Sequence, residues 1–236
     1  MHIAVFDANT DTSDLVRHHP GETAKFQSLL TSVVPDWTFA PYRVHRDQFP
    51  EGLTGLDGII ISGSPASAND PDAWVGRLMD TIRTAVNADI PVFGACFGHQ
   101  AVARALGGKV ARNDHGWSLG RIETDNHSPA SWMPLAPPRI ALHGAHKEQV
   151  VVVPKGARIL AGIAGVPVGH LALGSRVFTT QYHPEFTRDF MAALLEELAL
   201  ELDAPLIDQA RASLTRDADG PLMARWMVNF FAQTLR

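Results

Sequence analysis

Short apolar runs alternate with amphipathic stretches along the first half of the chain. This alternation is typical of βαβ units, in which helices connect the strands of a parallel sheet. The apolar runs predict strands near residues 2–7, 38–44, 57–62 and 90–95. Apolar residues at helical spacing predict helices near residues 21–34, 71–88 and 97–107. Pro71 fits the first turn of the second of these helices, with Asp70 before it as the cap.

The pattern becomes β-rich between residues 109 and 182. Short β-branched and apolar runs are separated there by Gly and Pro, and they lie at residues 139–142, 150–153, 158–160 and 176–182. Such runs are typical of strands joined by turns. We therefore expect an α/β fold with an open, mostly parallel (flavodoxin-like) sheet, helices on its faces and an antiparallel β extension.

Helical patterns return at the C-terminal end of the chain. Apolar residues from Phe190 to Leu202 form one helical face opposite Glu196 and Glu197, and residues 205–236 add two further helical patterns. These helices either cover the sheet, which we favour, or form an interface with a second copy or another partner. We expect one domain over residues 1–190, with residues 191–236 as a helical extension packed on it.

The only cysteine of the chain, Cys96, lies in the sequence Gly-x-Cys-x-Gly between a strand pattern and a helix pattern. This is the arrangement of a nucleophile elbow with sulfur in place of a hydroxyl. Gly94 and Gly98 let the backbone turn sharply. A helix N-terminus favours the reactive thiolate, and its free amides can hold an oxyanion. The alternative, a cysteine that is simply a small buried apolar residue, fits the two flanking glycines less well.

A second motif, Gln-Tyr-His-Pro-Glu at residues 181–185, follows a strand pattern. Residues i and i+2 of an extended segment point the same way, so His183 and Glu185 can share one face. A carboxylate beside an imidazole sets its tautomer and supports the cation that forms when the imidazole takes a thiol proton. Cys96, His183 and Glu185 are therefore the candidate catalytic residues.

His146 and Glu148 form a second His-x-Glu pair and hence a rival to His183 and Glu185. Together with His143 they could also be taken as metal ligands. Their spacing matches none of the strong zinc patterns, and the chain has no second cysteine. We expect no metal site here.

The segments Gly-Ala-Cys-Phe-Gly-His-Gln at residues 94–100 and Gln-Tyr-His-Pro-Glu closely resemble those of the class I (triad) glutamine amidotransferases. The resemblance extends over most of residues 1–190 and implies a stand-alone glutaminase-like member. On this resemblance, Cys96 attacks the side-chain amide of glutamine, His183 moves the proton and Glu185 orients His183. A γ-glutamyl thioester forms, ammonia leaves, and water releases glutamate.

The same resemblance implies roles for residues outside the triad. The run Ile-Ile-Ile-Ser-Gly-Ser-Pro at residues 59–65 resembles the family loop whose glycine amide completes the oxyanion hole. Gly63 and Phe97 are then the implied oxyanion donors. Gln100 matches a position that lines the glutamine pocket, although a solvated residue in the first turn of a helix is its simpler interpretation.

Two further segments are implied on the substrate side. Gly116 and Trp117 resemble a segment of stand-alone members, and His146 lies in a stretch that resembles a family sequence written His-x-Asp-x-Val. Glu148 replaces the aspartate of that sequence, which puts the role of this acid in doubt. Gly116, Trp117 and His146 are therefore candidate substrate-binding residues.

Composition adds an expected compartment and excludes some partners. The chain has 236 residues, of which 45% are hydrophobic and 19% charged, enough for one substantial core. A single cysteine fits the reducing cytoplasm, and the first residues read as a strand instead of a signal peptide. The longest apolar runs are too short for a membrane span. A net charge of −5 with scattered Lys and Arg argues against binding of nucleic acid.

Three functions stay open at this point. The first is a glutaminase that passes ammonia to a separate synthetase subunit, because the chain has no Gly-x-x-x-x-Gly-Lys-Ser/Thr loop and hence no predicted nucleotide cofactor. The second is a hydrolase of a γ-glutamyl peptide or amine that uses the same triad. The third is a non-catalytic regulatory protein that keeps the fold. The intact set of Cys96, His183 and Glu185 favours the first two.

Overall fold

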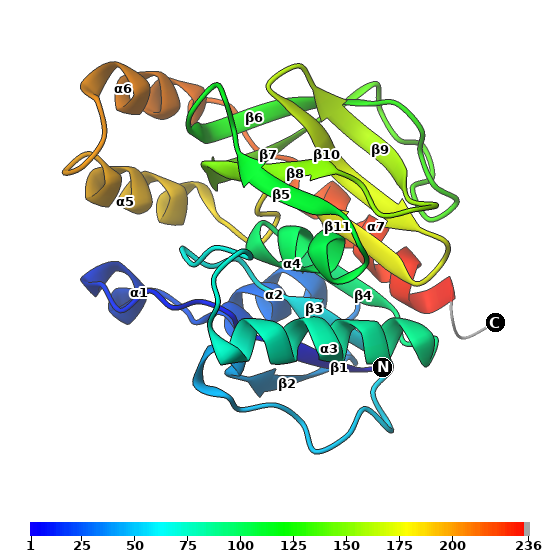
Figure 1. Cartoon of the computed structure of the whole chain (residues 1–236). Coiled ribbons are helices and arrows are strands. Elements are labelled where there is room, and N and C mark those ends of the chain that lie inside the picture. Colours follow the sequence, from blue (N-terminus) through cyan, green and yellow to red (C-terminus); the bar gives the residue numbers. More distant parts are fainter. Residues whose placement is uncertain (234–236) are drawn as a thin grey trace.

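A nine-stranded sheet forms the centre of the molecule in the computed structural model, which describes residues 1–233 (Figure 1). Its strand order is β2-β1-β3-β4-β11-β10-β9-β6-β7, and β5 and β8 form a separate antiparallel pair. The strands are β1 (His2–Phe6), β2 (Thr38–Tyr42), β3 (Gly58–Ile61), β4 (Val92–Ala95), β5 (Lys109–Arg112), β6 (Ser118–Asn126), β7 (Arg139–His146), β8 (Glu148–Val152), β9 (Arg158–Ile163), β10 (Val166–Leu173) and β11 (Val177–Thr180).

The first five strands of this order, from β2 to β11, pair in parallel, and the remaining four pair antiparallel. The α/β fold with a mostly parallel sheet and an antiparallel extension is thus confirmed. Two strands of the extension carry weak sequence signals. β6 is largely polar, and β10 contains Pro167 and Gly169, two residue types that weaken a strand pattern.

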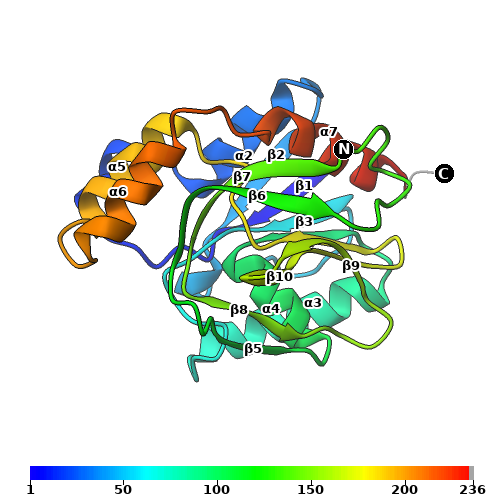
Figure 2. The ribbon, with the colours of Figure 1, turned by 90° about the horizontal axis from the view of Figure 1, so that it is seen from above.

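Helices cover both faces of the parallel part of the sheet (Figure 2). They are α1 (Asp14–His18), α2 (Glu22–Thr31), α3 (Ala73–Asn87), α4 (Phe97–Ala105), α5 (Arg188–Leu198), α6 (Ala204–Ser213) and α7 (Gly220–Ala232), with a 3-10 turn η1 at Val44–Arg46. α3 and α4 pack on one face, and α2 and α7 pack on the other. Alternate residues of β3 serve the two cores, since Ile59 and Ile61 face α3 and α4 while Ile60 faces α2 and α7.

The start of α3 differs from the prediction. This helix begins at Ala73 with Asp72 at its N-cap, so Pro71 lies before its first turn. The Asp70 carboxylate accepts a hydrogen bond from the backbone N–H of Ser67, at 2.8 Å, and closes the preceding loop instead of capping the helix. Short polar residues form such local loops as readily as they cap helices, which is why the two are difficult to tell apart from sequence.

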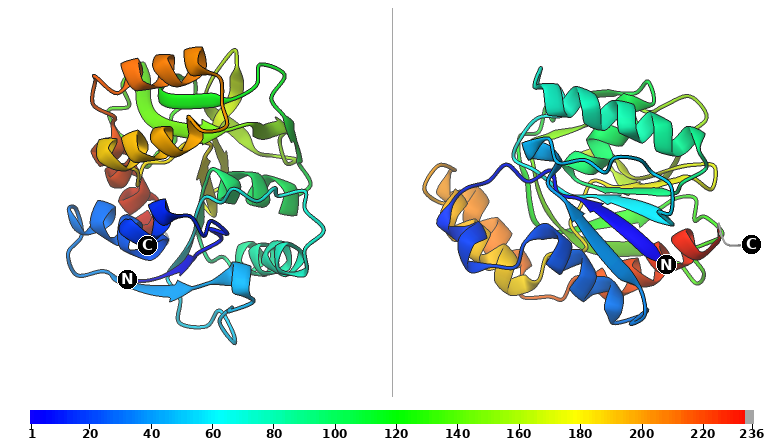
Figure 3. Two further views of the ribbon diagram at one scale, coloured as in Figure 1. Left: turned by 90° about the vertical axis from the view of Figure 1, so that its left-hand side faces the viewer. Right: turned by 90° about the horizontal axis from the view of Figure 1, so that it is seen from below.

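The C-terminal helices have two locations. α7 buries Trp226, Met227 and Phe230 against the sheet, whereas α5 and α6 form a small core of their own beside β6 (Figure 3). An interface with another chain on these helices, and a domain division at residue 190, stay predictions. Within the described residues, no helix combines the length and the apolar character needed to cross a membrane.

Three of the buried histidines have strongly lowered pKa values, and we expect them to make the protein sensitive to acid. Burial lowers the pKa of His99 and of His170 to about 3 and that of His146 to about 4. The unfolded chain protonates these groups below pH 6.5 and the folded chain does not, so stability falls as the pH drops below that value. Each histidine should cost up to about 2 kcal/mol of unfolding free energy by pH 5.

Urea unfolding between pH 7.5 and pH 5 measures this effect. Replacement of buried His170 by leucine should lower the slope of the unfolding free energy against pH. The decrease should correspond to about one proton fewer taken up on unfolding, because one group no longer titrates in the unfolded chain. The same replacement at exposed His127 is the matched control and should leave the slope unchanged. An unfolding free energy that stays constant from pH 7.5 to pH 5 would contradict the prediction.

Candidate active site

Cys96 lies at the sharp turn between β4 and α4, where it is the N-cap residue of the helix. Its backbone angles are φ 49° and ψ −104°, and a positive φ is strained for a residue with a side chain. A Cβ atom on Gly98 would collide with the carbonyl oxygen of Ile61 on β3, and one on Gly94 would lie 2.6 Å from the carbonyl oxygen of Gly98. The two glycines thus let the helix approach the sheet closely enough to form this turn.

His183 and Glu185 follow the end of β11 and are almost fully buried. The Nδ1–H of His183 donates to Oε1 of Glu185 at 2.8 Å. The backbone N–H of His183 donates to the carbonyl oxygen of His143 on β7 at 2.8 Å. The imidazole stacks on the ring of Phe186, with centroids 3.9 Å apart and planes 12° apart. The ring is therefore held in one orientation by a carboxylate, a backbone bond and an aromatic face.

The electrostatic surroundings of His183 favour its charged form. Burial alone lowers the pKa of His183, but the carboxylate of Glu185 and the anionic sulfur of Cys96 raise it by more, to about 10. At neutral pH the imidazole is then a cation. Such a cation carries the proton that a leaving group needs, and it also stabilises a thiolate beside it.

Gln181 is a site residue whose role was not predicted from the sequence. Its Nε2 donates to Sγ of Cys96 at 3.8 Å, and its Oε1 accepts a hydrogen bond from Nε2 of Gln100 at 3.3 Å. Nε2 of Gln100 also donates to the backbone oxygen of Glu148, at 2.7 Å. Gln181 is the first residue of the Gln-Tyr-His-Pro-Glu motif, directly after β11. The sequence pattern predicts only a strand here and does not indicate that the side-chain amide contacts the sulfur.

The predicted oxyanion donors come from two different segments, the start of α4 and the loop after β3. Phe97 is the first residue of α4, so its backbone N–H is among those without an intrahelical partner. Gly63 follows β3 by two residues, and a Cβ atom there would lie 2.5 Å from Cε1 of His183. Only glycine fits between this loop and the imidazole. The oxyanion role of both residues stays a proposal.

Two pockets meet at Cys96. The larger, with a volume of about 350 Å³, has polar and charged walls that include Asp70, Gln100, Arg112, His146, Lys147 and Glu148. The smaller, of about 140 Å³, contains His183 and has largely apolar walls. Trp117 lines both pockets, with Nζ of Lys147 5.6 Å from its ring centroid. Cys96 can thus contact a molecule that extends into both.

The predicted substrate-side residues are placed differently relative to these pockets. Gln100, Trp117 and His146 line the larger pocket. Gly116 lies in the turn before β6, with φ +79°, and the pocket linings in the described part of the chain include Trp117 but not Gly116. A substrate contact of Gly116 therefore stays a prediction without a supporting contact.

The rival pair of His146 and Glu148 does not form a carboxylate–imidazole pair. Nδ1 of His146 donates to the backbone oxygen of Glu148 at 3.0 Å, and the Glu148 carboxylate instead accepts a bond from Oγ of Ser67 at 2.6 Å. His143 donates through Nδ1 to the backbone oxygen of Phe186 at 3.0 Å. Among residues 1–233, no group of three or more His, Cys, Asp or Glu side chains is arranged to hold a metal ion.

A buried ion pair lies against the rings of Phe186 and Phe190 and was not predicted either. Nζ of Lys25 is 2.9 Å from Oε1 of Glu22, and both side chains are nearly inaccessible to solvent. Lys25 also lies over the rings of Phe190 and Phe186, at 3.8 and 5.1 Å from their centroids. Burial, offset in part by Lys25, raises the pKa of Glu22. In the sequence, this pair looks like any exposed i,i+3 pair on a helix.

The sequence of the chain is similar to those of known enzymes. A model of the family "Glutamine amidotransferase class-I" matches residues 31–200. The chain is 27% identical to gamma-glutamyl peptidase 3 of Arabidopsis thaliana, over 96% of this chain and 95% of the relative. It is 30% identical to gamma-glutamyl peptidase 4 of the same plant, over 82% and 79%. A GMP synthase of Aeropyrum pernix is 32% identical over 59% of this chain and 26% of the relative.

Solved structures share the fold. A glutamine amidotransferase of Thermotoga maritima superposes with a TM-score of 0.79 at 16% identity, over 98% of this chain and 96% of the other. A glutamine amido transferase of Methylobacillus flagellatus gives 0.74 at 22% identity, over 99% and 93%. The family match covers more than half of the chain and includes the cysteine elbow and the His183–Glu185 pair. The chain belongs to the class I glutamine amidotransferases, a family of cysteine-based amide hydrolases.

Proposed function

We propose that this protein hydrolyses the amide bond of a γ-glutamyl compound through Cys96, His183 and Glu185. The observation that carries the proposal is the convergence of a cysteine at a strained elbow with a buried His–Glu pair, at the junction of two pockets. Membership in an enzyme family and the assembled pair argue against the non-catalytic alternative.

In the first half of the reaction, Sγ of Cys96 attacks the γ-carbonyl carbon and forms a C–S bond. The carbonyl oxygen becomes an oxyanion, for which the N–H groups of Gly63 and Phe97 are the candidate donors. The C–N bond then breaks, and the leaving nitrogen takes the proton from Nε2 of His183, whose Nδ1–H is held by Glu185. The products are an amine, or ammonia from glutamine, and a γ-glutamyl thioester.

In the second half, water attacks the thioester carbon while neutral His183 accepts one of its protons. The C–S bond breaks, glutamate leaves, and Cys96 and His183 return to the thiolate and imidazolium. One water is consumed for each amide bond. The chain's own groups supply every proton transfer in this cycle, so the proposed mechanism uses no cofactor.

The larger pocket fits the amino-acid end of the γ-glutamyl group. This end carries an α-carboxylate and an α-ammonium, which need charged or polar partners when they leave water. Arg112 and Lys147 supply positive charge, and Asp70 and Glu148 supply negative charge. Gln100, Trp117 and His146 complete the walls as predicted substrate contacts.

Two substrates share this chemistry. Glutamine is the simplest, and it is supported by similarity to GMP synthases described as glutamine-hydrolysing. Its use as an ammonia source would require a separate acceptor subunit. A γ-glutamyl peptide or amine is the second candidate. It is supported by similarity over nearly the whole length of gamma-glutamyl peptidase 3, whereas the chain spans about a quarter of the GMP synthase it matches. A cytoplasmic location, where the thiol stays reduced, suits both.

A substrate panel tests the proposal. We expect purified protein to release glutamate from glutamine, from γ-glutamyl dipeptides or from γ-glutamyl amines, and kcat/KM ranks the three. A higher kcat/KM for glutamine favours the glutaminase. A higher kcat/KM for a γ-glutamyl dipeptide or amine favours the γ-glutamyl peptide or amine hydrolase. The proposal fails if none of these substrates gives glutamate while the protein is folded.

A further inference from the structure

The position of His183 decides which pocket receives which end of the substrate. The amine that leaves must take a proton from the imidazole, so it must lie on the same side of Cys96 as His183. Of the two pockets at Cys96, the one of about 140 Å³ is lined by His183, and the larger polar pocket is not. If the γ-glutamyl part fills the larger pocket, the substituent of the leaving nitrogen enters the smaller one.

The smaller pocket is built from segments far apart in the sequence. α1 contributes Leu15 and Val16 to one wall, and α5 contributes Leu194 and Leu198 to another. α1 and α5 lie side by side at one edge of the molecule (Figure 3). These four aliphatic side chains make the walls between α1 and α5 apolar.

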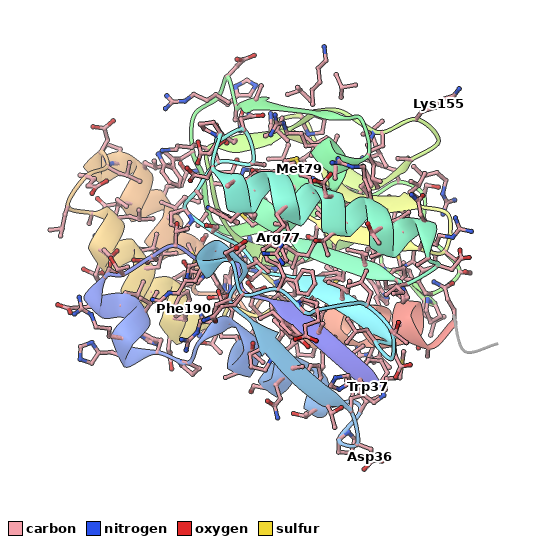
Figure 4. The ribbon with its side chains drawn as sticks, turned by 60° about the horizontal axis from the view of Figure 1, so that its bottom comes forward. Asp36, Trp37, Arg77, Met79, Lys155 and Phe190 are labelled. Atoms are coloured by element: carbon pink, nitrogen blue, oxygen red, sulfur yellow. The ribbon has the colours of Figure 1, made fainter. Side chains whose placement is uncertain are left out.

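Aromatic rings complete the pocket. Phe190 (labelled in Figure 4) lies on α5 and contacts the ring of His19 edge-on, with centroids 5.1 Å apart. Phe186 connects Phe190 to the imidazole of His183, since its centroid is 4.4 Å from one ring and 3.9 Å from the other. A cavity of about 150 Å³ lined by apolar side chains holds one benzene molecule in another protein. A pocket of about 140 Å³ therefore suits a six-carbon ring or a chain of similar size.

The charges in the smaller pocket disfavour a carboxylate on the leaving group. Asp11 and Glu22 both line it, and its one lysine, Lys25, is already paired with Glu22 at 2.9 Å. The imidazolium of His183 is likewise paired, with Oε1 of Glu185 at 2.8 Å. Among the described residues that line this pocket, no unpaired cation is left to neutralise a carboxylate, whereas a neutral substituent needs none.

We propose that the pocket between α1 and α5 binds the leaving amine, and that the preferred substrate is the γ-glutamyl amide of a primary amine with an aryl or alkyl group of about six carbons and no carboxylate. This inference rests on the proposed function. It selects γ-glutamyl amines over both glutamine and γ-glutamyl peptides.

Four substrates that differ only beyond the γ-amide nitrogen test this inference: glutamine, γ-glutamyl methylamide, γ-glutamyl benzylamide and γ-glutamylphenylalanine. We expect kcat/KM for the benzylamide to exceed that for the methylamide by about tenfold or more, because the ring fills the apolar pocket. We also expect γ-glutamylphenylalanine, which has the same phenyl ring, one more carbon between ring and nitrogen, and an added carboxylate, to be at least about tenfold poorer than the benzylamide.

Variants of Leu15 locate the effect in this pocket. Leu15 belongs to α1, which has no buried residue, so its replacement should spare the fold. Leu15→Ser should lower the benzylamide to methylamide ratio of kcat/KM by about tenfold. Leu15→Trp should shift the substrate preference, measured as kcat/KM, toward the methylamide, because the indole ring occupies part of the smaller pocket. Leu200→Ser, at a leucine that is 85% exposed beyond the end of α5, is the matched control and should keep the wild-type ratio.

The outcomes separate this inference from the proposed function. Glutamate release from glutamine with no preference for the benzylamide over the methylamide overturns the leaving-group pocket and leaves the γ-glutamyl chemistry standing. Equal use of the benzylamide and γ-glutamylphenylalanine overturns the exclusion of carboxylates. A shift of the ratio in Leu200→Ser equal to that in Leu15→Ser overturns the location. Absence of glutamate release from all four substrates overturns the proposed function itself.

Discussion

Replacement of Cys96 by alanine is expected to abolish glutamate release, with kcat reduced by about 10⁴-fold or more. Without Sγ, the C–S bond of the thioester cannot form, and neither His183 nor Glu185 is positioned to replace the nucleophile. The fold should survive, because alanine adds no atoms at the crowded elbow and keeps the same backbone angles. The measurement is steady-state glutamate release from the best substrate of the panel, on variant and wild type side by side.

Covalent trapping makes this expectation more specific. Acid quenching of the wild-type enzyme during turnover should give a fraction of the protein with the mass of one added γ-glutamyl group, which maps to the peptide that contains Cys96. The Cys96→Ala protein should show no such mass. A melting temperature close to wild type serves as the control for folding. Retention of the wild-type rate in Cys96→Ala would remove the cysteine from the mechanism.

Glu185→Gln is expected to lower kcat by about 10² to 10⁴-fold while keeping the size of the side chain. The carboxylate that accepts the Nδ1–H of His183 at 2.8 Å becomes a neutral amide, so the tautomer and orientation of the imidazole are no longer fixed. The same change lowers the pKa of His183, because Glu185 is the main group that raises it. The imidazolium is then lost at a lower pH, and the alkaline side of the pH–rate profile should move to lower pH.

Glu148→Gln provides the matched comparison, since it is the same chemical change in the rival His-x-Glu pair. The Glu148 carboxylate bonds to Ser67 and not to His146, so its loss should act mainly on KM through the larger pocket. The alkaline limb of the profile should stay in place. If Glu148→Gln lowered kcat more than Glu185→Gln does, the orienting acid would have been assigned to the wrong residue.

Several parts of the fold and site could be predicted because they depend on local sequence. The elbow around Cys96 is a strand, a glycine-flanked turn and a helix in succession, and each leaves its own pattern within a few residues. The inner parallel strands β1, β3 and β4 are almost wholly apolar on both faces and stand out as continuous runs. His183 and Glu185 are two residues apart, so their bond needs only an extended backbone between them.

Other parts could not be predicted, because they depend on contacts between distant segments. β6 is polar, and its pairing with β7 and β9 gives it a strand conformation that its residues alone do not indicate. α1 has five residues, too few to show a helical period, and it lies beside α5. The helical spacing of Glu22 and Lys25 suggests an exposed pair, and only packing under Phe186 and Phe190 makes it a buried one.

The sequence by itself determined the chemistry of this protein: a thiol at an elbow, an imidazole with its carboxylate, and membership in a family of amide hydrolases. These features can be recognised from the sequence, because each motif lies within one short segment of the chain. The tertiary structure alone decided what surrounds the thiol. Leu15 and Leu194 meet only after α1 and α5 pack together, and this contact creates the second pocket beside His183. A cavity is a property of packing between segments, and no local pattern encodes its volume or its charge.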